Sequence, residues 1–131
     1  MKLEALKSCP PVSAEQNSTL AFYVARQELC LVYEAERDFL STPRAFVVVR
    51  AQLDSDAELH LNHTTLSEPE AAFLASNAYG VYCNTLSEAP FKHLFFYSPK
   101  MTLECIAIGL QPITTLYHHN DVRSALKHAM G

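Results

Sequence analysis

The residues of this 131-residue chain that could do chemistry are chiefly its six histidines and four cysteines. His60 and His63 have the spacing of a metal-binding pair, but on a strand two residues three apart point to opposite faces. A metal site would therefore have to combine side chains from different strands. The candidate set is His60, His118, His119 and Glu104. We favour the simpler interpretation that these are polar residues on sheet faces and at strand ends, and we expect no metal and no other cofactor.

Nucleophilic catalysis would need a thiol, a base and an orienting group close together. Cys83 lies in a predicted connector after a helix, where an exposed thiol could meet His93. The cysteines show no CxxC spacing and are expected to be reduced, structural thiols, so the sequence leans away from an enzyme. An alternative is a ligand pocket between sheet and helix, lined by His60, Cys83, His93 and Tyr97.

Charge and composition exclude several functions. No lysine or arginine occurs between Arg50 and Lys92, and the net charge is −4, which argues against nucleic-acid binding. Three glycines leave no phosphate-binding loop. No apolar run is long enough to span a bilayer, and the first ten residues lack a signal-peptide pattern, so we expect a cytoplasmic protein with no membrane contact.

The apolar pattern predicts elements that would position these residues. Residues 91–97, 101–109 and 113–119 alternate or are β-rich and are separated by turn signals, which predicts three antiparallel strands. Residues 44–53 and 58–64 predict a hairpin, and residues 81–90 a connector. Ser67 and Glu70 form a capping box for a helix that should end at Tyr79, and Asn120 should cap the final helix.

Residues 18–40 have two interpretations. Phe22, Ala25 and Leu29 recur at helical spacing, and residues 34–37 (Glu-Ala-Glu-Arg) favour a helix. The alternation of residues 20–24 and 29–33 favours a hairpin instead. We predict one long helix and keep the hairpin as its rival.

These elements predict an α+β fold, a mainly antiparallel sheet of about five strands flanked by helices, in the order α-β-β-α-β-β-β-α. One domain would span residues 1–131, with residues 1–12 as a short N-terminal segment. The element order resembles that of roadblock and longin-type adaptor domains, and of type III secretion chaperones, which implies an accessory role.

The function expected from the sequence is a non-catalytic, cytoplasmic protein–protein interaction module that acts as a homodimer. Its low charge and its apolar strands motivate this expectation. The predicted interface residues are Phe96, Ile106 and Ile108. The alternative is a small enzyme or ligand-binding domain that uses the pocket named above.

Overall fold

The computed structural model describes residues 3–13, 20–39, 42–54, 59–62, 66–85 and 92–131. Within them the fold is a nine-stranded antiparallel sheet with two short helices. The strands are β1 (Leu3–Ala5), β2 (Ala21–Ala25), β3 (Glu28–Glu34), β4 (Phe46–Leu53), β5 (His60–Leu61), β6 (Gly80–Thr85), β7 (Lys92–Tyr97), β8 (Thr102–Leu110) and β9 (Thr114–Leu116). The helices are α1 (Glu68–Ala75) and α2 (Val122–Met130). The predicted arrangement of about five strands between three helices is therefore wrong, although the antiparallel sheet is confirmed.

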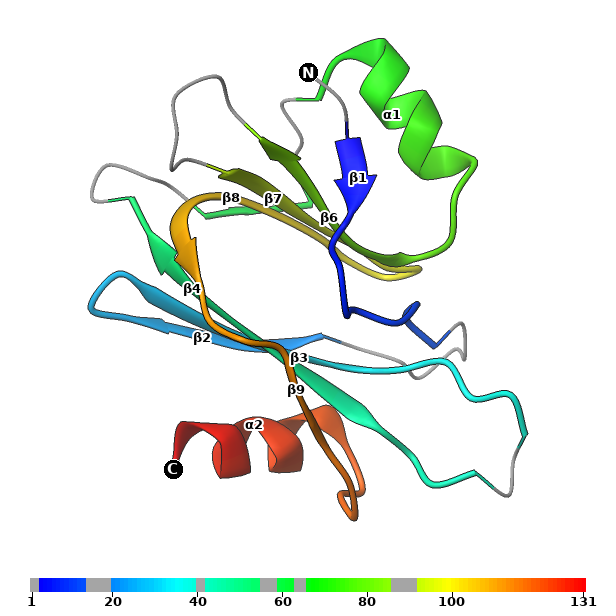
Figure 1. The fold of residues 1–131 in the computed structure, drawn as a ribbon, viewed down its shortest axis with the longest axis vertical. Coiled ribbons are helices and arrows are strands. Elements are labelled where there is room, and N and C mark those ends of the chain that lie inside the picture. Colours follow the sequence, from blue (N-terminus) through cyan, green and yellow to red (C-terminus); the bar gives the residue numbers. More distant parts are fainter. Residues whose placement is uncertain (1–2, 14–19, 40–41, 55–58, 63–65, 86–91) are drawn as a thin grey trace.

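The sheet bends into two layers, and each layer carries one helix on its outer face (Figure 1). Its strand order is β1-β6-β7-β8-β4-β3-β2, with β5 paired to β8 and β9 paired to β4. Strand β8 passes from one layer to the other, and its last residues pair with β4 beside an irregularity at Gln52 and Leu53. Bulges of this kind let a sheet turn a corner.

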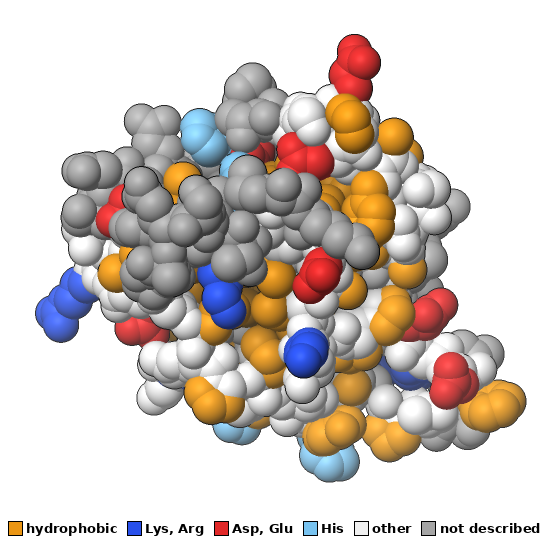
Figure 2. Space-filling model, turned by 45° about the horizontal axis from the view of Figure 1, so that its top comes forward, with side chains coloured by type: hydrophobic (Ala, Val, Ile, Leu, Met, Phe, Trp, Pro, Cys, Tyr) orange, Lys and Arg blue, Asp and Glu red, His pale blue; other side chains and the backbone are white. Residues whose placement is uncertain are grey.

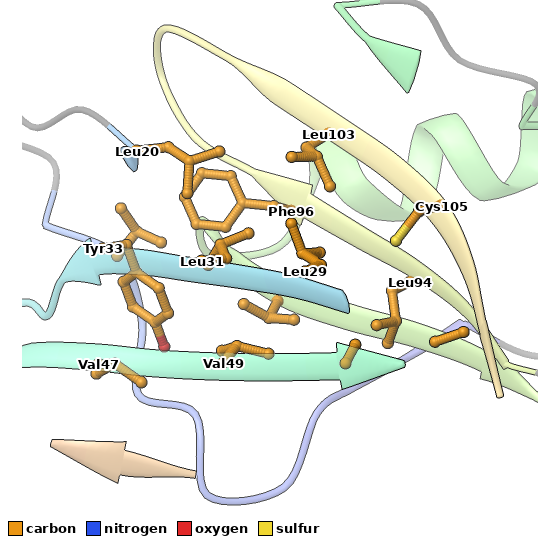
Figure 3. Packing of buried hydrophobic residues seen from close by; sticks show 14 of the residues in the cluster. Leu20, Leu29, Leu31, Tyr33, Val47, Val49, Leu94, Phe96, Leu103 and Cys105 are labelled. Carbon is orange, nitrogen blue, oxygen red and sulfur yellow. The ribbon is translucent and has the colours of Figure 1, made fainter. Parts of the chain in front are cut away.

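The largest apolar cluster fills the space between the two layers (Figure 3). Tyr33 of β3 and Phe96 of β7 meet across it, with ring centroids 5.6 Å apart. The Tyr33 hydroxyl donates a 2.6 Å hydrogen bond to the Pro10 carbonyl, so the buried phenol has a partner. Two smaller clusters lie on the outer faces, one beneath α1 and one against α2.

Residues 21–34 form the β2–β3 hairpin, so the predicted helix over residues 18–40 is wrong. Residues 18, 19 and 40 of that prediction lie outside the described part of the chain. The turn residues Arg26 and Gln27 have φ values of 52° and 63°, as two-residue hairpin turns require. In β3, Leu29, Leu31 and Tyr33 face the central cluster, while the alternate residues face α2. Because both faces of β3 are buried, residues 29–33 are all apolar, and such a run fits a strand and a buried helix alike.

Other predicted elements differ in their partners or lengths. The strand at His60–Leu61 pairs with β8 and not with β4, so the predicted 44–53/58–64 hairpin is wrong. The first five residues of the predicted connector at 81–90 belong to β6, and its last five lie outside the described part of the chain. The Ser67–Glu70 capping box is confirmed, although α1 ends at Ala75 and not at Tyr79.

The C-terminal helix is confirmed, but its N-cap is Asp121 and not Asn120. The Asp121 carboxylate accepts a 2.8 Å hydrogen bond from the Ser124 amide. Neither this helix nor any other in the described ranges has the length and apolar character needed to cross a membrane.

Candidate ligand site beneath helix α1

A cavity of about 160 Å³ lies between α1 and the outer face of β7 and β8. Its wall is mainly apolar and includes one buried carboxylate. Residues that line it include Leu66, Leu74, Phe95, Tyr97, Thr102 and Glu104. In the view with the top of the molecule turned forward, apolar side chains are visible at the surface with charged side chains scattered among them (Figure 2).

Strand register places the carboxylate of Glu104 on this wall. Glu104 of β8 lies directly opposite Phe95 of β7 and opposite His60 of β5. Residues directly opposite in an antiparallel pair share a face of the sheet, so these three side chains lie on the α1 side. The apolar cover leaves Glu104 only 3% exposed.

Glu104 is paired with His93. The His93 Nε2 atom lies 2.6 Å from Glu104 Oε1, and the His93 ring lies against Phe95 with centroids 4.3 Å apart. A buried carboxylate needs such a partner, because desolvation without compensation costs several kcal/mol. The pair holds one polar group at a fixed position on an otherwise apolar wall.

A second polar pair continues the site toward the start of α1. Asn84 of β6 lies opposite His93, is 1% exposed, and donates a 2.8 Å hydrogen bond to Glu70 Oε2. Glu70 Oε1 in turn accepts from the amide and the hydroxyl of Ser67. The capping box of α1 thus holds the Glu70 carboxylate in place, and Glu70 in turn orients the Asn84 side chain.

These contacts change the acidity of Glu70. Its pKa is lowered, mainly because the Ser67 hydroxyl donates to the ionised carboxylate. The Ser67 amide, the charge of His93 and the Asn84 amide act in the same direction, against the opposing effect of desolvation. Glu70 is therefore an anion at neutral pH.

One buried acceptor in this group stays unsatisfied. The side-chain oxygen of Asn84 has no hydrogen-bond partner among the described residues. An unpaired buried acceptor costs about 1–3 kcal/mol, which a donor from water or a ligand would recover.

The structure brings together three of the four predicted pocket residues. His60 is opposite Glu104, His93 is bonded to it, and Tyr97 lines the cavity. Cys83 points to the opposite face, against the central apolar cluster, because it lies one residue before Asn84 in β6. A Cys83–His93 catalytic pair is therefore not assembled, and burial raises the pKa of the Cys83 thiol.

The predicted metal set is divided between the two layers. His60 and Glu104 lie on the α1 layer, whereas His118 and His119 follow β9 on the other layer. In the part of the chain that the structure describes, no group of three or more His, Cys, Asp or Glu side chains could hold a metal ion.

The predicted interface residues do not share one surface. Phe96 is 2% exposed and belongs to the central cluster, so it cannot contact a partner while the fold is intact. Ile106 and Ile108 are half-buried residues of β8. Ile106 lies on the face that carries Glu104, whereas Ile108 lies at the register shift between β8 and β4.

Sequence reasoning missed Asn84 as a site residue. Its position in a presumed connector gave no sign that it was buried in a strand. The sequence assigns Glu70 only a capping role. A capping box uses one carboxylate oxygen, so the other oxygen of Glu70 could have been expected to bind a second partner.

No protein-family model, curated protein or solved structure matches this chain.

Proposed function

We propose that this protein binds a compact organic ligand in the cavity beneath α1. The observation that carries the proposal is the position of the buried Glu104 carboxylate, held by His93 on the wall of an otherwise mainly apolar cavity. Small-ligand sites commonly combine an apolar wall with a few fixed polar groups. The Glu104 carboxylate accepts a hydrogen bond from the ligand, and the aromatic wall excludes water.

The cavity also limits the ligand's size and charge. A cavity of about 150 Å³ can enclose benzene, so about 160 Å³ accommodates a single ring with one small substituent. A ligand with an O–H or N–H donor matches Glu104, whereas a carboxylate ligand would be repelled by it. We therefore expect phenol to bind more tightly than benzene, and benzoate not to bind.

Calorimetric titration with phenol, benzene and benzoate tests this function. Glu104→Gln should reduce the phenol-to-benzene affinity ratio by about tenfold or more, because it removes a charge-assisted hydrogen bond. The ratio is informative even if the variant binds both ligands less well. A wild-type protein that binds none of the three, or binds benzoate best, would refute the proposal.

A matched pair of helix variants tests the location. Ala71 and Ala72 are both exposed residues of α1, but Ala71 lines the cavity and Ala72 does not. Ala71→Leu should weaken phenol binding by at least about tenfold because the added carbons occupy the cavity, and Ala72→Leu should leave it unchanged. Equal effects of the two substitutions would place the binding site elsewhere.

A second candidate function, a homodimeric interaction module, is favoured by the β2 edge. Strand β2 ends the sheet order, and in the described ranges no further strand pairs with it. Its sequence, AFYVA, has no charged residue and no proline, the devices that usually protect an exposed edge. Antiparallel pairing of two copies about Tyr23 would place Phe22 of each copy opposite Val24 of the other, with no charges in conflict.

Sedimentation equilibrium tests the dimer with two equally exposed tyrosines. Tyr23 and Tyr117 are each 50% exposed, but only Tyr23 lies on β2. Tyr23→Lys should yield a monomer, since it places two lysines opposite one another, and Tyr117→Lys should remain a dimer. A monomeric wild type would exclude this second function and leave the ligand site untouched.

The state of the cysteines supports a reducing compartment such as the cytoplasm. All four cysteines lie in the described ranges and are free thiols. Desolvation is the main cause of a raised pKa at each of them. Protonated, unpaired thiols are usual in cytoplasmic proteins.

A further inference from the structure

Two histidines on the α2 side of the molecule face each other through their ring nitrogens. The Nε2 atom of His119, in the loop before α2, lies 3.0 Å from Nδ1 of His128 in the last turn of the helix. Their ring centroids are 5.0 Å apart, and the ring planes are inclined at 70° to each other. The ligand site beneath α1 uses neither residue.

The His119 ring is held in place from two sides. Its Nδ1 atom lies 2.9 Å from the Ser124 hydroxyl, one helical turn before His128. The ring also packs against the buried Phe46 ring, with centroids 6.2 Å apart and ring planes at 90°. When the Ser124 hydroxyl accepts the Nδ1 proton, the Nε2 lone pair of His119 is directed at His128.

This arrangement matches the usual surroundings of a metal-binding histidine. Such a histidine donates its second ring N–H to a neighbouring oxygen, which fixes the ring and its tautomer. Two imidazole nitrogens bound tetrahedrally to Zn²⁺ lie about 3.3 Å apart, so the 3.0 Å separation needs only a small opening. His128 is exposed, so water can complete the coordination.

We infer that His119 and His128 form a surface site for one divalent late transition-metal cation, with Ser124 as the residue that orients His119. Imidazole is a preferred ligand of Zn²⁺, Ni²⁺ and Cu²⁺ and a poor ligand of Mg²⁺. The Asp121 carboxylate, bonded to the Ser124 amide in the same turn, adds a negative charge that favours a cation. Arg123 and Lys127 each lie one position before Ser124 and His128, respectively, and therefore on the neighbouring face of the helix.

The same three side chains could instead suggest a serine nucleophile with a histidine base. The charge nearby argues against it. The Asp121 carboxylate beside Ser124 would repel the oxyanion that forms when a hydroxyl attacks an ester. It would attract a metal ion at the same place.

The thiols of the chain are poor competitors for the metal. Cysteine binds metal as thiolate, and burial raises the pKa of Cys9 to about 11 and that of Cys105 to about 12. Cys30 and Cys83 are shifted in the same direction by the same cause. At neutral pH these thiols keep their protons.

Calorimetric titration of the whole chain with Zn²⁺ in a non-chelating buffer tests the site. We expect one ion per chain, stronger binding of Ni²⁺ or Cu²⁺ by direct titration or competition, and no heat with Mg²⁺. His119→Gln and His128→Gln should each weaken Zn²⁺ binding by at least about tenfold, and Ser124→Ala by about tenfold. His118→Asn is the matched control, because His118 is adjacent and exposed, and Asn tolerates its φ of 65°. It should bind Zn²⁺ as the wild type does.

Circular dichroism of each variant shows whether it is folded, and substitutions at the half-buried His119 and the exposed His128 should leave the spectrum unchanged. An unchanged Zn²⁺ affinity in folded His119→Gln and His128→Gln would overturn the inference by assigning the ion to other ligands. Absence of Zn²⁺ binding by the wild type would overturn it as well. An equal loss of affinity in His118→Asn would do the same, because the effect would then not depend on the facing pair.

Discussion

The Glu34 carboxylate and the Arg44 guanidinium form a two-point ion pair, with Nε–Oε2 and Nη2–Oε1 distances of 3.0 and 2.8 Å. The Glu34 side chain is 6% exposed and that of Arg44 is 40% exposed, so the pair lies where the buried interior meets the solvent. Arg44 also donates a 2.6 Å hydrogen bond to the Asn120 carbonyl, and its guanidinium lies 5.4 Å from the Phe46 ring centroid. One side chain therefore joins the β3–β4 pair to the loop that leads into α2.

Arg44→Met should lower the free energy of unfolding by about 1–3 kcal/mol, because Glu34 would remain buried without its partner, although solvent at the partly exposed Arg44 position reduces this loss. The double variant Glu34→Leu/Arg44→Met should lose less, since no uncompensated charge remains. Urea unfolding of the two single variants and the double variant measures the coupling. A double variant whose loss equals the sum of the single losses would contradict a direct interaction.

Glu70 should make the protein more stable above the ordinary carboxyl range than below it. Its pKa is lowered from 4.5 in the folded state, mainly by the Ser67 hydroxyl, so the folded state binds the proton less tightly than the unfolded chain. The stabilisation is complete above about pH 4.5 and is lost as the pH falls through the folded-state value. Unfolding at several pH values should show that Glu70→Gln flattens this part of the profile.

Ser67→Ala distinguishes the helix-capping role of Ser67 from the effect of the Glu70 charge. It should cost about 1 kcal/mol at neutral pH and also reduce the pH dependence, because Ser67 is the main cause of the shift at Glu70. Glu70→Gln keeps a side chain that can serve in a capping box and should cost less at low pH than at neutral pH. A parallel displacement of both variants at every pH would show that Glu70 has the same pKa in the folded and unfolded states.

The four thiols should react slowly with iodoacetamide at neutral pH. Burial raises the pKa of each, and Cys105 is 1% exposed with a pKa of about 12. Because the thiolate is the reactive form, labelling of Cys83 between pH 7 and 9 should rise about tenfold per pH unit, without a plateau. Mass spectrometry of timed samples measures each site. Fast labelling of Cys83 at pH 7 would contradict a half-buried, structural thiol and would support a catalytic role instead.

Sequence reasoning succeeded where the physical signal is local. The Ser67–Glu70 cap needs only residues within one turn, and the strands around Phe96 and Cys105 contain long runs of apolar residues between turn signals. It failed for β3, because Leu31 faces the central cluster while Val32 faces α2 and both are buried. A strand covered on both sides is apolar at every position, so an alternating pattern and a helical pattern can both be found in it.

The candidate site could be predicted only in part for a related reason. His93 and Tyr97 alternate along one predicted strand, so their shared face follows from sequence. The contact of Asn84 with Glu70 does not, because it depends on how α1 lies across β6. The pairing of His60 with Glu104 likewise depends on a β5–β8 contact that joins distant parts of the chain.

The turn between β2 and β3 should be improved by glycine. Gln27 has a φ of 63°, a region that costs a side-chain-bearing residue about 1–2 kcal/mol, while glycine adopts it freely. Its carbonyl accepts a 2.7 Å hydrogen bond from the Leu53 amide, and a side-chain change leaves that bond in place. Gln27→Gly should therefore raise the free energy of unfolding by up to about 1 kcal/mol, after the greater entropy of glycine in the unfolded chain is subtracted.

The same substitution at Gln111 is the control for this effect. Gln111 is also exposed and also has a backbone hydrogen bond, from its amide to the Arg50 carbonyl, but it is not among the positive-φ residues. Gln111→Gly should lower the free energy of unfolding by roughly 0.5–1 kcal/mol, because it only adds unfolded-state entropy. Thermal or urea unfolding of the two variants thus yields changes of opposite sign if residues 21–34 form a hairpin. If those residues were instead helical, glycine at position 27 would destabilise the protein as it does at position 111.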